Sequence, residues 1–154
     1  MQPAISVREF RSDDARHMAR LHKESEQCFE ERDIDEGFIL GVAGRSDFRF
    51  YVASAGSGIV GFCGVMFYPH VGRAEIGPIA VDARYRNRKI AAKLLAGTED
   101  FLRKSAIHRV IARVKAQNSN AVRFFLSMGF QEEGFFRRYT RNNEDVVQYV
   151  KFLL

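Results

Sequence analysis

The segment VDARYRNRKIAAKLL (81–95) joins the apolar end of a strand to an amphipathic helix through a basic turn. Residues 84–93 of this segment carry five cations and no acid. Unpaired backbone N–H groups and the helix dipole favour negative charge where a helix begins. The segment therefore predicts a site for a phosphate-bearing ligand, with positive charge supplied by Arg84, Arg86, Arg88, Lys89 and Lys93.

Outward from this turn, hydrophobic periodicity predicts the order β-α-α-β-β-β-α-β-α-β-β. Such an order folds as an α/β protein (α+β, mixed sheet) with parallel and antiparallel strands and helices on its faces. Gly77-Pro78 interrupts one strand, and proline cannot donate to a central ladder, so we expect a bulge or splay there. The expected strands are 5–11, 48–55, 59–68, 74–81, 108–115 and two within 130–154. Four helices are expected: one starting at 13–14, one within 31–43, one following residue 89 and one starting at 118–119. In the last of these, Val122, Phe125 and Leu126 should face inward.

The bulk composition is that of one globular domain covering 1–154. Apolar residues make up 46% and charged residues 28%, which excludes a disordered chain. No apolar run approaches the ~20 residues of a membrane span, and the N-terminal sequence lacks the apolar core of a secretory signal. The two cysteines do not suggest a disulfide framework. We therefore expect a cytoplasmic protein without a membrane partner.

Other familiar motifs occur out of context. Residues 56–61 spell G-x-G-x-x-G, but the chain continues as a strand, so we interpret 56–58 as a hairpin turn. His17 and His22 are five residues apart and do not share a helical face, and there is no C-x-x-C. Cys63 lies in a predicted strand, where a free cysteine is commonly buried. We expect neither a metal site nor a cysteine nucleophile.

Charge is segregated along the chain. Residues 24–36 carry seven acids against one arginine, whereas 84–93, 103–115 and 137–141 are basic. A nucleic-acid binder presents one broad positive face, with aromatic residues interleaved as stacking platforms. The pattern therefore disfavours a nucleic-acid partner. The acidic stretch is either a solvated surface or a wall for a second, cationic ligand.

Two blocks, IAVDARYRNRKIAAKLL (79–95) and NSNAVRFFLSMGFQEEG (118–134), resemble the GNAT superfamily of acyl-CoA-dependent N-acetyltransferases. Members typically show a strand ending in V-x-P, then Y-R-G-x-G-I-G-x-x-L-L, and later N-x-x-A-x-x-L-Y-x-x-x-G-F. The resemblance covers about 60–154, and the N-terminal third matches only by element order. It implies transfer of an acetyl group from acetyl-CoA to a primary amine, and it is compatible with a homodimer.

The resemblance also implies a cofactor site. The backbone of Ile79, Ala80 and Val81 would pair with the pantetheine arm and polarise the thioester carbonyl. Asn118 would lie near the acyl end, and Phe125 occupies the position where many members carry tyrosine. The amides of the turn would wrap the pyrophosphate, at Arg86, Asn87, Arg88, Lys89, Ile90 and Ala91.

Three departures from the family pattern concern this site. Asn87 and Lys89 replace two loop glycines and Ala91 replaces the last. Glycine adopts positive φ at no steric cost and asparagine tolerates it, but lysine has neither advantage. The backbone at Lys89 must therefore be either ordinary helix or strained. Phe125 cannot protonate a leaving thiolate, the role that the resemblance implies for the family tyrosine. The proton would then come from water or from another group such as Tyr139, or its transfer would not be limiting.

The acceptor side is less well specified. Glu75 is the candidate general base; the alternative is an outward-facing strand acid paired with Arg73. The resemblance implies that the first helices and the terminal strands form the acceptor wall. The acids of the first helices then predict a cationic amine: a polyamine, an aminoglycoside-like amine, or a lysine- or N-terminus-bearing peptide. Tyr139, Arg137 and Arg138 could instead hold an acceptor carboxylate. Two rival interpretations stay open, a catalytically silent acyl-CoA-binding module and a nucleic-acid-binding basic domain.

Overall fold

The computed structural model describes residues 4–29, 31, 33–56, 58–86 and 88–153. The described strands form one seven-stranded sheet in the order β1-β2-β3-β4-β5-β7-β6, in which every neighbouring pair is antiparallel except β4–β5. The predicted order of helices and strands is confirmed. The strands are β1 (Ile5–Glu9), β2 (Phe48–Ala55), β3 (Gly58–Tyr68), β4 (Arg73–Val81), β5 (Arg109–Lys115), β6 (Gln131–Phe136) and β7 (Val146–Phe152).

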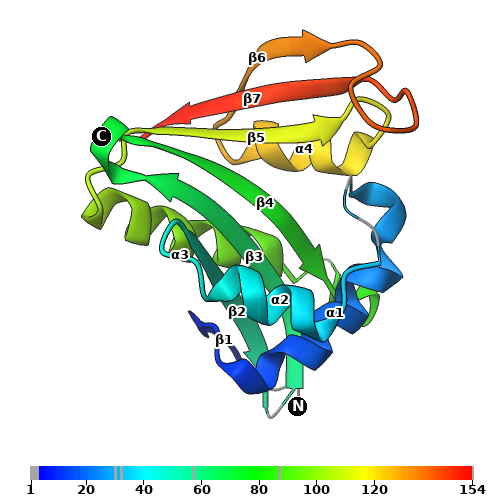
Figure 1. Ribbon diagram of the computed structural model, residues 1–154, viewed down its shortest axis with the longest axis vertical. Coiled ribbons are helices and arrows are strands. Elements are labelled where there is room, and N and C mark those ends of the chain that lie inside the picture. The colour runs from blue at the N-terminus through cyan, green and yellow to red at the C-terminus, as the bar shows by residue number, and fades with distance from the viewer. Residues whose placement is uncertain (1–3, 30, 32, 57, 87, 154) are drawn as a thin grey trace.

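Helices cover both faces of the sheet. Helices α1 (Ala15–Glu24) and α2 (Glu36–Ala43) lie in front of it in Figure 1, and α3 (Ile90–Lys104) lies behind it. Met18 and Leu21 of α1 are buried against Phe50 and Phe62 of the sheet. The opposite face buries the apolar stripe of α3 together with one residue of α4 (Ser119–Ser127), Phe125.

The sheet divides at its only parallel pair among the described strands. Residues 73–76 of β4 pair with 109–112 of β5, and beyond them the two strands diverge (Figure 1). Gly77-Pro78 lies at this point, and the β3–β4 register shifts opposite it, between Cys63 and Val65. A Cβ on Gly64 would lie 2.9 Å from the Gly77 carbonyl oxygen, so the glycine permits this close approach. The expected disruption of the strand is therefore confirmed.

One prediction about the core is wrong. Leu126, expected to face inward with Val122 and Phe125, is 51% exposed. The helix α4 is only nine residues long, and Phe125 is its one buried residue. The i, i+3, i+4 spacing marks a broad apolar stripe, but this helix contacts the sheet through a narrower part of it.

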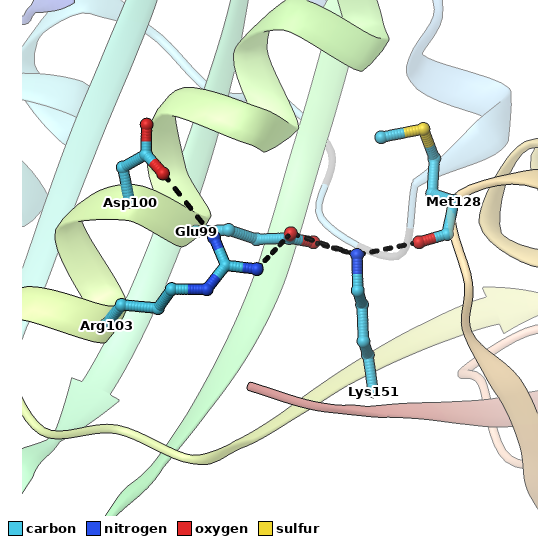
Figure 2. A network of polar contacts seen from close by, with 5 residues as sticks. All are labelled: Glu99, Asp100, Arg103, Met128 and Lys151. Carbon is cyan, nitrogen blue, oxygen red and sulfur yellow. Dashed lines mark hydrogen bonds and ion pairs between the residues drawn. The ribbon is translucent and has the colours of Figure 1, made fainter. Parts of the chain in front are cut away.

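A polar cluster connects α3 to the second half of the sheet (Figure 2). The Lys151 ammonium on β7 lies 3.0 and 3.1 Å from the two oxygens of Glu99 on α3. It also donates to the Met128 carbonyl, 2.8 Å away, at the C-terminal end of α4. Lys151 thus provides a hydrogen-bond donor to a carbonyl at the end of α4 and a counter-charge to the buried carboxylate of Glu99. The cluster fixes α3 relative to α4 and β7.

No helix of the described chain combines the length and apolar character that a membrane crossing requires.

Candidate active site

The divergence of β4 and β5 leaves one backbone edge of β4 without a strand partner. On the β3 side, Ile79, Ala80 and Val81 pair with Cys63, Phe62 and Gly61. On the β5 side, the described residues provide β4 with no ladder partner beyond Ile76. Backbone N–H and C=O groups of this edge therefore remain available to a ligand that lies along the strand. Ile79, Ala80 and Val81, for which the resemblance implies contact with a pantetheine arm, lie on this edge.

The basic turn follows directly and carries less free charge than expected. Asp82 begins the short 3₁₀ turn η4 (Ala83–Tyr85), accepting from the Arg84 amide at 2.9 Å. The Arg84 side chain also donates to it, from Nε at 3.2 Å and from Nη2 at 2.8 Å. These bonds lower the pKa of the Asp82 carboxyl, and the ion pair offsets part of the Arg84 charge. The prediction missed this because Asp82 lies outside the acid-free run.

Lys89 has a left-handed backbone, with φ 58° and ψ 29°, and forms the N-cap of α3 without a side-chain capping bond. Of the two conformations left open for this residue, the strained one is therefore present. A non-glycine residue in this region costs about 1–2 kcal/mol. Since the Lys89 side chain makes no capping bond, the described residues leave the amides that begin α3 available to an anion.

The remaining predicted cofactor residues occupy distinct environments. Arg86 and Lys89 are exposed, Arg88 stacks over the Tyr85 ring at 5.1 Å, and Ala91 is half-buried. The side chain of Ile90 is buried in the core, so only its backbone can face a ligand. Asn87 lies outside the described residues.

The two predicted cofactor residues of the second sequence block (118–134) have different roles: one caps a helix and the other lies in the core. The Asn118 carboxamide oxygen accepts from the Ala121 amide at 3.2 Å and caps α4. Phe125 packs edge-to-face on Phe130, with ring centroids 5.1 Å apart. The face of the sheet that contains Phe125 is opposite the one that carries Arg113, because Arg113 alternates with the buried residues Ala112 and Val114.

A cavity of about 450 Å³ lies on the face covered by α1 and α2. Much of its wall is aromatic or aliphatic, including Phe48, Phe50, Phe62 and Met66. It reaches Glu75, Gly77 and Pro78 at the divergence of the strands, so it adjoins the free edge of β4. Among the described residues, its charged lining consists of two acids and three cations: Glu31, Glu75, Arg45, Arg113 and Lys115.

Glu75 and Tyr139 are connected through a residue that sequence reasoning did not single out. Arg113 Nη1 lies 3.5 Å from Glu75 Oε1 and donates to the Tyr139 hydroxyl at 3.2 Å. Glu75 lines the cavity with its side chain 38% exposed, whereas Tyr139 lies outside the cavity lining. The alternative prediction that Glu75 pairs with Arg73 is wrong, because Glu75 forms its ion pair with Arg113. The alternation of β5 placed Arg113 opposite the core but did not indicate its partner.

The acidic stretch contributes little to the cavity. Of its described acids, Glu31 lines the wall, while Glu26 accepts from the Asp33 amide at 2.8 Å and Asp35 caps α2 by accepting from the Phe38 amide at 2.8 Å. Glu24, Asp33 and Glu36 lie outside the lining, and Glu30 lies outside the described residues. Glu26 and Asp35, which were expected to face the acceptor, therefore serve instead to accept backbone hydrogen bonds in a turn and at a helix cap.

Lys115 holds two cavity walls together and was not predicted. Its ammonium donates to the Gln27 carbonyl at 2.9 Å and lies 3.1 Å from Glu144 Oε1. Gln27 precedes α2, and Glu144 lies in the β6–β7 connection. Cys63, as predicted, is buried, and burial raises the pKa of its thiol to about 12. No cluster of three or more potential metal ligands occurs among the described residues.

Residues 12–130 match the model of the acetyltransferase (GNAT) family. The chain therefore belongs to this family, in agreement with the resemblance noted in its sequence. The match covers the free edge of β4, the basic turn and α4.

Individual proteins and structures extend this assignment. The N-alpha-acetyltransferase RimI of Mycobacterium tuberculosis is 33% identical over 94 residues, which are 58% of this chain and 56% of RimI. The chain thus matches just over half of that relative's length. The Ard1 structure from Thermoplasma volcanium aligns with a TM-score of 0.86 at 21% identity, covering 98% of this chain and 99% of that one. The yncA structure from Salmonella typhimurium with its cofactor acetyl-CoA gives 0.86 at 16% identity, covering 98% and 95%.

Proposed function

We propose that this protein is an N-acetyltransferase that moves the acetyl group of acetyl-CoA to a primary amine bound in the cavity beside Glu75. The observation that carries the proposal is the unpartnered edge of β4, which runs between the α3 N-terminus and this cavity. A donor lying along that edge would present its thioester to an amine in the cavity. The acetyl-CoA bound to the yncA relative supports the choice of donor.

The binding steps follow from the chain's own groups. Amides of the turn and of the first residues of α3 bind the pyrophosphate, with Arg86, Arg88 and Lys89 adding positive charge. The backbone of Ile79, Ala80 and Val81 pairs with the pantetheine arm, and an amide of this edge donates to the thioester oxygen. The resemblance to the family further suggests that the acyl end would come near Asn118 and Phe125.

The chemical step is attack by a neutral amine on the thioester carbon. The nitrogen forms the new amide bond while the carbon–sulfur bond breaks and CoA leaves as a thiolate. Glu75 accepts the amine proton, directly or through one water molecule. Phe125 has no proton to give, and Tyr139 is bound to Arg113 beyond the cavity lining, so water protonates the thiolate.

For the acceptor we favour the N-terminal amine of a peptide over a polyamine. The described part of the cavity wall is mainly apolar. Its charged residues are two acids and three cations, and each cation is paired with an acid, so the wall offers no excess of negative charge to a second positive group. An N-terminal amine with a small or apolar first side chain carries one charge and suits such a wall. The N-alpha-acetyltransferase name of the RimI relative supports this choice.

The test is release of free CoA thiol from acetyl-CoA in the presence of peptides, polyamines and aminoglycosides. We expect turnover with peptides to exceed that with polycations. Glu75→Gln should lower kcat by about 10²–10⁴-fold with unchanged acetyl-CoA binding, whereas the exposed strand acid variant Glu132→Gln should keep wild-type kcat. Binding of acetyl-CoA without turnover of any amine would instead support the silent module. Salt-dependent RNA binding that CoA fails to displace would support the nucleic-acid-binding domain.

A further inference from the structure

His22, in the last turn of α1, is a buried polar side chain without a hydrogen bond. It is 1% exposed, and neither Nδ1 nor Nε2 has a partner among the described residues. Buried polar atoms are nearly always paired, and each unpaired one costs about 1–3 kcal/mol. Two such atoms on one ring therefore need an explanation.

The imidazole is neutral in this environment. Burial lowers the pKa of His22, and the nearby charges of Glu26 and Glu31 only partly oppose this effect. A neutral imidazole carries one N–H donor and one nitrogen acceptor. The ring thus offers a donor and an acceptor together, and Phe29 stacks on one of its faces with ring centroids 4.6 Å apart.

The position of the ring links it to the acceptor. His22 lines the same cavity as Glu75, and its neighbour Phe29 also belongs to the wall. The three lining cations all have partners: Arg45 pairs with Asp47, Arg113 with Glu75, and Lys115 with Glu144. His22 differs from them because its hydrogen-bonding capacity is unused.

We propose that His22 determines acceptor specificity by hydrogen bonding to a neutral hydroxyl or carboxamide that the acceptor carries beside its amine. Such a group both donates and accepts, so it can engage either nitrogen of the ring. This proposal rests on the proposed function, because it assigns the cavity to the acceptor.

The experiment compares acceptors that differ by one polar group. The probes are serine- and alanine-initiated tripeptides of otherwise identical sequence, with ethanolamine and propylamine as a smaller pair. For the wild-type protein we expect kcat/KM for the hydroxyl member to exceed that of its partner by about tenfold or more. His22→Phe should bring the ratio to about one and retain turnover of the apolar member. The matched control is His17→Phe on the exposed face of the same helix, which should keep the wild-type ratio.

A second measurement needs no substitution in the cavity. The ring ¹⁵N resonances of His22 in the wild-type protein should shift when the serine peptide is added and stay in place with the alanine peptide. A wild-type ratio near one, or a ratio that His22→Phe leaves unchanged, would overturn the proposal and point to a ring that binds only water. Absence of turnover with every amine would overturn the proposed function itself, which is a separate result.

Discussion

Replacing Lys151 by methionine should destabilise the protein strongly, because it leaves a buried carboxylate without its main partner. Glu99 is 4% exposed, and Lys151 contacts both of its oxygens as well as the Met128 carbonyl (Figure 2). Breaking one side of a buried ion pair costs about 3–5 kcal/mol. Arg103, 3.7 Å from Glu99, retains part of the compensation, so we expect about 3 kcal/mol.

Urea unfolding at pH 7 measures this loss, and the corresponding decrease in Tm is about 6–12 °C for a chain of this size. The double variant Glu99→Gln, Lys151→Met should recover most of it, since no unpaired charge is then buried. Lys104→Met, at the last residue of the same helix and exposed, should change stability by less than about 0.5 kcal/mol. A loss below about 1 kcal/mol for Lys151→Met, or no recovery in the double variant, would refute this reasoning.

Two further changes test the turn and the first helix. Lys89→Gly relieves the left-handed backbone and should raise the free energy of unfolding by about 0.5–1 kcal/mol in urea; a decrease would mean that Lys89 is not strained. Burial opposes ionisation of Asp14, but bonds from the Arg8 side chain and the Arg11 amide lower the pKa of its carboxyl. This stabilisation is complete above the unfolded pKa of about 4 and disappears as pH falls through the lower folded value. Asp14→Asn should therefore cost about 1–3 kcal/mol at pH 7, and progressively less as the pH falls below the unfolded pKa; a cost that does not change with pH would contradict the ionic role.

Much of the fold was predictable because it is encoded in local periodicity. The β-branched and aromatic runs at 48–55 and 59–68, the alternation along 108–115, and the turn and cap residues between elements suffice to order the strands and helices. Gly77-Pro78 marked the disruption of β4, since proline cannot continue a central ladder. These signals depend on neighbours in sequence, and the sequence displays them directly.

The parts of the site that escaped prediction depend on contacts between distant residues. Glu75 pairs with Arg113 rather than Arg73 because β5 lies beside β4 with a register that no local pattern reveals. Lys115 contacts Gln27, which is 88 residues away in sequence. His22 shows nothing unusual within its helix, and its unpaired ring becomes apparent only when α1 packs beside Phe29. A single sequence records the residue types but not these neighbours.

Amide hydrogen exchange with and without acetyl-CoA tests the central claim most directly, namely that the donor lies along the free edge of β4 and the turn that follows. We predict slower exchange in peptides covering 77–82 and 88–92 when acetyl-CoA is added, and unchanged exchange in β1, at the far edge of the sheet. Unchanged exchange throughout 77–92, at concentrations where calorimetry detects binding, would contradict the account.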